Sequence, residues 1–233
     1  MGIDYSYVIY VRPEKARDLL LATAAMCRRY ADPTTVELPS GESVSLPFTV
    51  SWAGGSTVRL EPGTTLALDL VPCFVEDDVL LAYGAEPVIW PDGTSRIPVG
   101  YTYLSIGEAT GHFAGHLAFE FTPASSEQSR VYLRSPSVRA AYADLAARAD
   151  APLCLLDVEA WRYYVIVAVY GRQLADLFWT AGTQTDRSEC FAWLENPTYR
   201  PDFVVGPEHR DYDGIVAELN RASGLGDDTV AWS

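Results

Sequence analysis

Basic residues are scarce in this sequence, and lysine is nearly absent. Lys15 is the only lysine, and 17 basic residues stand against 31 acidic ones, for a formal net charge of −14. Such a surface repels phosphate backbones and anionic headgroups, so we expect no nucleic acid and no membrane as partner. The preference for arginine over lysine is typical of a GC-rich bacterial genome.

Long apolar runs and secretion signals are missing as well. No stretch approaches the roughly 20 apolar residues that cross a bilayer, and the opening MGIDYS lacks a basic segment followed by an apolar one. The cysteines are dispersed, form no CxxC pair and mostly have apolar neighbours, which is typical of buried free thiols. They are Cys27, Cys73, Cys154 and Cys190. These patterns predict a cytoplasmic protein.

Motifs for catalysis are not found either. The sequence has no Gly-x-Ser-x-Gly turn, no His-Glu-x-x-His helix and no phosphate-binding glycine loop. Apolar residues make up 48% of the 233 positions, which is ordinary for a globular domain. We therefore expect a folded, non-catalytic protein that holds no cofactor and no metal.

What is present is a series of short strands, turns and a few helices. Residues 4–12 (DYSYVIYVR) are apolar on both faces, which predicts a strand covered on both sides. Pro13 favours a helix start, and the helical spacing continues to about Tyr30. Turn sequences at 39–41 and 91–93 predict hairpins, the second followed by a strand over 97–106. The fold class expected is α+β, with mostly antiparallel sheets built from hairpins and three to five helices.

The predicted elements of the second half of the chain repeat those of the first in order. Residues 130–134 (RVYLR) predict a strand, Ser135-Pro136 starts a helix, and two strands follow within 153–170. We therefore predict one domain over 1–233 in which 4–50 and 130–171 are strand-helix-strand-strand units related by pseudo-symmetry. An irregular C-terminal extension, 172–233, follows. The alternative is coincidence, since helices joined to hairpins are common.

This repeated order resembles the duplicated module of some bacterial effector-binding domains, which hold apolar ligands between the two copies. The resemblance is one of element order over about a third of the chain, with no shared motif, and so transfers no site residues. It implies a small-molecule site between the two units.

The histidines give a candidate metal site. Glu108, His112, His116 and Glu120 recur every four residues, and their side chains suit zinc. Glycines recur at the same period, however, which makes a helix improbable and favours a loop between 106 and 117. We expect both histidines to meet water in that loop.

Two carboxylates form the second candidate site. Asp157 and Glu159 point to the same side of a predicted strand, where they could act as an acid–base pair. The favoured alternative is that the strand leaves the core there and both carboxylates reach solvent near Trp161.

Alternating tyrosines form the third candidate. Tyr101 and Tyr103 share a strand face, as do Tyr5 and Tyr7. Such rings can line an apolar pocket, form a partner surface or pack under a helix.

Three functions follow from these patterns. The first is a non-catalytic interaction or regulatory protein that binds a basic protein partner, with a homodimer also compatible. The second is a binding protein for a small apolar ligand held in an aromatic pocket between the two units. The third is a hydrolase that uses the carboxylates Asp157 and Glu159 or a metal at His112 and His116.

Overall fold

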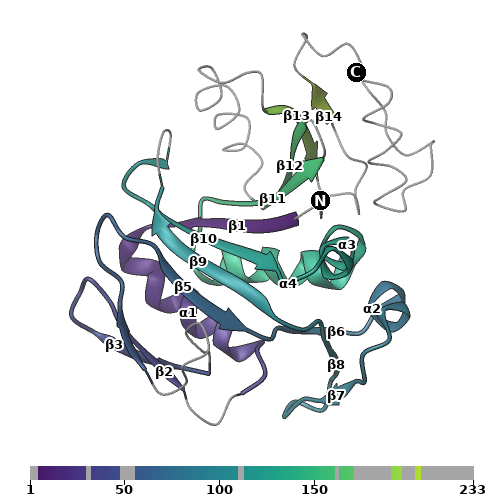
Figure 1. Cartoon of the computed structure of the whole chain (residues 1–233), viewed down its shortest axis with the longest axis horizontal. Helices are drawn as coiled ribbons and strands as arrows, with labels where there is room; N and C mark the ends of the chain where they lie inside the picture. The colour runs from purple at the N-terminus through teal and green to yellow at the C-terminus, as the bar shows by residue number, and fades with distance from the viewer. Residues whose placement is uncertain are drawn as a thin grey trace.

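The chain folds as an α+β protein in the computed structural model, which describes residues 5–29, 33–47, 56–109, 113–160, 163–170, 190–195 and 203–205 (Figure 1). The helices are η1 (Pro13–Lys15), α1 (Ala16–Ala25), α2 (Asp78–Tyr83), α3 (Ser126–Arg134) and α4 (Pro136–Arg148). The first seven strands are β1 (Tyr5–Val11), β2 (Thr34–Glu37), β3 (Ser43–Leu46), β4 (Thr57–Arg59), β5 (Leu66–Leu70), β6 (Cys73–Val75) and β7 (Val88–Ile89). The others are β8 (Ser95–Pro98), β9 (Thr102–Glu108), β10 (Leu117–Pro123), β11 (Leu153–Ala160), β12 (Tyr163–Tyr170), β13 (Cys190–Glu195) and β14 (Phe203–Val205).

The strands form one large sheet and two small ones. The large sheet has eight strands in the order β14-β13-β12-β11-β1-β10-β9-β5, and the small sheets are β3-β2-β4 and β6-β8-β7. All pairs of the large sheet are antiparallel except β12 with β13, which are parallel. The mostly antiparallel sheet predicted from the hairpins is thus confirmed. Two strands of the region 172–233, β13 and β14, belong to this sheet.

The strand β1 lies inside the large sheet, but only one of its faces is fully covered, whereas the sequence predicted cover on both. It pairs with β10 on one side and β11 on the other. Tyr7 and Ile9 are fully buried, whereas Val8 and Tyr10, on the other face, are half-buried. The alternation shows that one face of the sheet carries the core.

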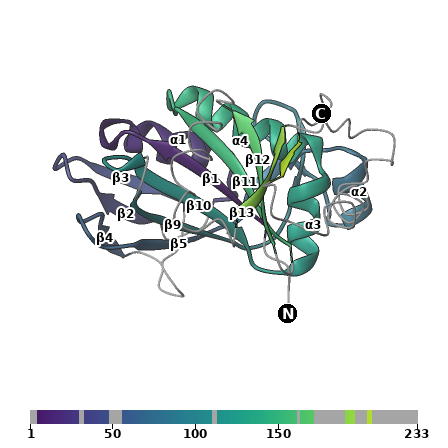
Figure 2. The same ribbon diagram turned by 90° about the horizontal axis from the view of Figure 1, so that it is seen from above.

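That core lies between the sheet and the helices α1, α3 and α4, which all cover the same face (Figures 1 and 2). Tyr7 of β1 stacks on Tyr142 of α4 with ring centres 4.0 Å apart, and Phe121 of β10 meets Tyr142 edge-on at 5.1 Å. The buried hydroxyls are paired, since Tyr7 donates to the carbonyl of Tyr132 at 3.0 Å and Tyr142 to the Tyr132 hydroxyl at 3.1 Å. Tyr7 therefore packs under a helix, one of the roles considered for the tyrosines.

The strand predicted over 130–134 is wrong, because these residues form the end of α3. A capping box at Ser125 and Gln128 starts this helix, and it buries Val131, Tyr132 and Leu133. The capping box and the burial of these three side chains outweigh the strand propensity of the segment. The second unit therefore opens with two helices, α3 and α4, and the pseudo-symmetry that we predicted is not confirmed.

Two other element boundaries differ from the expected ones. The first helix ends at Ala25 instead of near Tyr30, because Cys27 leaves the helix to bridge with Pro72. The single strand predicted over 97–106 is divided at Gly100, whose φ of +85° turns the chain. As a result β8 belongs to a small sheet and β9 to the large one.

Membrane spans and disulfides are not found in the part of the chain that the structure describes. None of its helices is long and apolar enough to cross a bilayer. Cys27, Cys73 and Cys154 are buried free thiols, as the sequence predicts. Burial raises the pKa of the Cys27 thiol, which keeps it in the unreactive protonated form.

Candidate functional site

The face of the large sheet opposite the helices carries the exposed aromatic residues. We call this surface, where it is formed by β5, β9 and β10, the open face (Figure 1). Its side chains alternate with core residues such as Leu68, Leu104 and Phe121. They are Ala67, Asp69, Tyr103, Ser105, Ala118, Glu120 and Thr122, with Tyr101 just before β9.

Two of the predicted site residues lie on this face. Tyr101 is 53% exposed and Tyr103 is 49% exposed, so neither ring packs under a helix. The sheet register places Tyr103 directly opposite Asp69 of β5 and Thr122 of β10. Strands in a sheet lie about 4.8 Å apart, so the ring of Tyr103 stands between these two side chains.

Carboxylates supply the charge of the open face. Glu120 is exposed and Asp69 is half-buried, and burial raises the pKa of Asp69 above its usual value. The Thr122 hydroxyl lies 2.8 Å from the Ser6 hydroxyl and 3.5 Å from Oε1 of Glu120. Among the described residues of this face there is no lysine or arginine. The open face is therefore an acidic and aromatic surface.

The described residues of the histidine-rich segment, 109 and 113–116, lie outside regular strands between β9 and β10, as expected. His116 donates its backbone N–H to the Phe113 carbonyl at 2.9 Å, and its ring meets the Phe113 ring edge-on at 5.6 Å. Phe113 in turn stacks on Tyr10 of β1 at 4.5 Å. His112 lies outside the described residues. Within those residues no group of three or more histidine, cysteine, aspartate or glutamate side chains is arranged to hold a metal ion.

The predicted carboxylate pair lies on β11. The backbone register places Asp157 opposite Ser6 of β1 and Ile166 of β12, and Glu159 two residues further along the strand. The side chains of Asp157 and Glu159, and Trp161 as a whole, lie outside the described residues. The hydrolase hypothesis based on them stays a prediction.

A groove that the sequence did not indicate lies between α1, α4 and the small sheet of β6 and β8. Its volume is about 440 Å³. Its lining is mostly apolar or small: Ala22, Ala25, Met26, Cys73, Phe74, Val75, Ala140, Ala141 and Leu145. The polar lining residues are Arg96, Ser137, Asp144 and Arg148. The groove thus has an apolar floor and a rim with two arginines.

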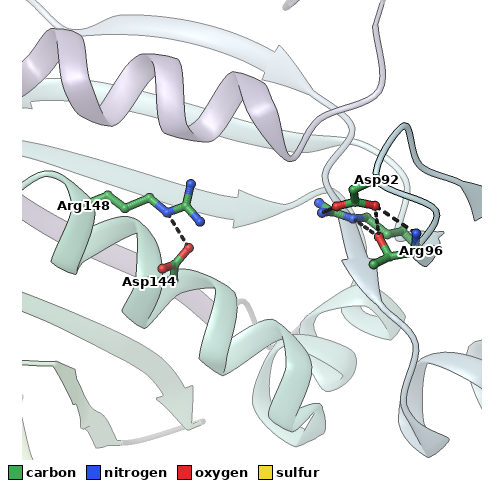
Figure 3. Close-up of polar contacts among 5 residues, drawn as sticks. Asp92, Arg96, Asp144 and Arg148 are labelled. Carbon is green, nitrogen blue, oxygen red and sulfur yellow. Dashed lines mark hydrogen bonds and ion pairs between the residues drawn. The ribbon is translucent and has the colours of Figure 1, made fainter.

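Each of the two arginines is already paired with an aspartate (Figure 3). On β8, Arg96 donates from Nη2 to Asp92 at 3.0 Å and from Nε to Thr94 at 3.1 Å. Its guanidinium carbon lies 4.7 Å from the centre of the Trp90 ring, which makes a cation–π contact. The Arg96 side chain is only 19% exposed and is held on three sides.

The second pair is simpler and more exposed. On α4, Nε of Arg148 lies 2.7 Å from Asp144, one helical turn earlier, and Arg148 is 62% exposed.

Hydrogen bonds from Thr94, and then the charge of Arg96, hold the pKa of Asp92 below its usual value, so the pair of Asp92 and Arg96 stays charged. The turn at Pro91-Asp92-Gly93 was visible in the sequence, but the position of Arg96 at the same groove as α1 and α4 depends on tertiary packing.

Comparison of the chain with protein families, with curated proteins and with solved structures finds no match. The function therefore has to be inferred from the chemistry of the open face and of the groove.

Proposed function

We propose that this protein is a non-catalytic interaction protein that binds a basic segment of a partner protein on its open face. The observation that supports this most directly is the placement of exposed tyrosines among carboxylates. Tyr101 and Tyr103 are about half exposed, and Asp69 and Glu120 are the charged groups among the described residues of that face.

An arginine or lysine of a partner fits the geometry around Tyr103. A cation over an exposed aromatic ring is attracted by the ring's negative face. Asp69 lies directly across the strand pair from Tyr103, and Glu120 lies on its diagonal, two residues before Thr122 on β10. Diagonal positions in a sheet are about 7–8 Å apart, within reach of a long side chain. A bound cation would thus have a ring beneath it and a carboxylate on each side.

Charge also supports a basic partner at longer range. The net charge of −14 steers cations toward the molecule, and tyrosine is enriched at the centres of protein interfaces. A cytoplasmic setting is part of this proposal, and the buried free thiols Cys27, Cys73 and Cys154 are compatible with a reducing compartment.

The test is site-specific crosslinking followed by affinity measurement. A photoreactive phenylalanine analogue in place of Tyr103 should crosslink one basic protein in host lysate, through a segment rich in lysine or arginine. With that partner purified, Asp69→Lys with Glu120→Lys should raise Kd at least tenfold, because like charges across an interface are strongly unfavourable. The wild-type affinity should also fall as NaCl is raised from about 0.05 M to 0.5 M, since salt screens exposed charges. Isothermal titration calorimetry measures both effects.

The matched control is Glu42→Lys with Glu86→Lys, which changes net charge by the same amount at two exposed acids away from the open face. This control should keep most of the wild-type affinity. Equal losses in the two double variants, or a crosslinked partner that is acidic, would contradict the proposal.

A further inference from the structure

The groove between α1 and α4 has the size and lining of a small-molecule site. Pockets for small ligands usually measure about 300–1,000 Å³ and combine apolar walls with a few placed polar groups. This groove, at about 440 Å³, has Phe74 and Leu145 in its floor, both nearly inaccessible to solvent. Alanines on the facing helices, Ala22 and Ala25 on α1 and Ala140 on α4, keep the space between them open.

The two guanidinium groups of the lining provide N–H donors for an anion. The lining side chains include two guanidinium groups, Arg96 and Arg148, and one carboxylate, Asp144. Both guanidinium groups are ion-paired, Arg96 with Asp92 and Arg148 with Asp144, so these four groups carry no net charge. An anion would therefore be held by N–H donors that the ion pairs leave open, and we place this contact at Arg96, which is less exposed than Arg148.

The guanidinium of Arg96 is positioned in advance for such an anion. Asp92 and Thr94 take hydrogen bonds from Nη2 and Nε, and the Trp90 ring covers one face. Within the described part of the chain, no residue accepts from Nη1 of Arg96. Arginine has five N–H donors in a planar fork, and the remaining ones match the geometry of a carboxylate. A side chain fixed by three contacts loses little freedom when a ligand binds.

We propose that this groove binds a free monocarboxylic acid with an apolar body. The carboxylate contacts Arg96, and the apolar part lies on Phe74, Leu145 and the alanines of α1 and α4. This site is separate from the open face and does not rest on the function proposed above. The two are tested by different variants.

The test uses octanoate and its neutral analogue octanamide as probes in isothermal titration calorimetry. We expect octanoate to bind the wild-type protein at least tenfold more tightly than octanamide, because a charge-assisted hydrogen bond is stronger than a neutral one. Arg96→Gln should remove this difference by weakening octanoate binding at least tenfold. Ala140→Leu, which keeps helix propensity but fills the groove at an exposed position, should weaken both probes.

Two controls keep the result interpretable. Arg17→Gln removes the same charge from an exposed position of α1 outside the groove lining and should leave octanoate binding unchanged. Arg148→Gln, at a more exposed arginine of the rim, should weaken octanoate by a smaller factor than Arg96→Gln and reports on the groove if Arg96→Gln does not fold. The proposal is overturned if octanoate and octanamide bind equally, if Ala140→Leu binds octanoate like the wild type, or if neither octanoate nor 3-phenylpropanoate binds up to about 5 mM.

Discussion

Replacing Asp77 by alanine should lower the free energy of unfolding by about 3 kcal/mol, although the residue lies at the surface end of a six-residue helix. This carboxylate joins the starts of two helices. Its Oδ1 accepts the backbone N–H of Leu80 at 2.8 Å and so caps α2. Its Oδ2 accepts the Ser135 hydroxyl at 2.6 Å and the backbone N–H of Ser137 at 3.0 Å, at the start of α4.

The magnitude follows from the number and kind of these hydrogen bonds. Loss of a helix N-cap costs about 1 kcal/mol, and hydrogen bonds to a charged group contribute about 1.5–3 kcal/mol. Asp77→Ala loses all three bonds and leaves Ser135 without its acceptor. Asp77→Asn keeps an oxygen that can cap α2 but loses the charge, so its effect should be about half as large. Urea denaturation followed by circular dichroism measures both.

The same carboxylate should make stability depend on pH in the acid range. Partial burial alone would raise the pKa of Asp77, but the hydrogen bonds from Ser135, Leu80 and Ser137 outweigh it and hold the pKa below its usual value. A lowered folded-state pKa stabilises the protein above the unfolded pKa of about 3.9, and that contribution is lost as the pH falls toward the folded value. The difference in unfolding free energy between wild type and Asp77→Asn should therefore be constant from pH 7 to about pH 5 and shrink below about pH 4.

Asp78→Asn is the control for this prediction. Asp78 is the next residue and is exposed, and Asp78→Asn removes the same charge from the first turn of α2. It should change the unfolding free energy by less than about 0.5 kcal/mol, since exposed substitutions away from specific contacts have small effects. If Asp77→Asn and Asp78→Asn have equal effects, the link between the two helices does not contribute as the geometry indicates.

Local patterns in the sequence were sufficient for most elements but not for their arrangement. The β-branched and aromatic residues of 4–12 and the turn at 91–93 predicted β1 and the β7–β8 hairpin, because strand propensity and turn conformation depend mostly on neighbouring residues. The helix α3 was missed because valine, tyrosine and leucine at 131–133 favour a strand by propensity. Ser125 and Gln128, three residues apart, were the pattern that could have shown a helix start.

The candidate sites were predictable to different degrees. The exposed side of β9 could be expected from the alternation of Tyr101 and Tyr103 with core residues. The groove could not, because its arginines lie 52 positions apart, at Arg96 and Arg148, and no local pattern relates them. They lie at one groove only because β6 pairs with β8 and α1 packs on α4. Tertiary contacts of this kind leave no periodic trace in a single sequence.

Replacing Gly100 by alanine is the second change that should strongly destabilise the protein, again by about 3 kcal/mol. Gly100 connects β8 to β9 with a φ of +85°, a conformation that costs other residues about 1–2 kcal/mol. In addition, a Cβ at this position would collide with Nε2 of Gln128. That amide donates to the Val99 carbonyl, and its Oε1 accepts the backbone N–H of Ser125 at 3.0 Å in the capping box of α3. Displacing Gln128 therefore removes a cap from α3 as well as straining the turn.

Gly93→Ala separates the two costs. Gly93 has nearly the same φ, +84°, but a Cβ there would meet no atom within 4 Å, so only the backbone cost of about 1 kcal/mol applies. Gln128→Ala should cost about 1 kcal/mol alone but make the added effect of Gly100→Ala smaller, because the colliding amide is gone. Denaturation of the single and double variants measures this coupling. Gly100→Ala should lower the free energy of unfolding by about 2 kcal/mol more than Gly93→Ala does. If the effects of Gly100→Ala and Gln128→Ala are additive, the close approach of Gly100 to Gln128 does not contribute to the cost of Gly100→Ala.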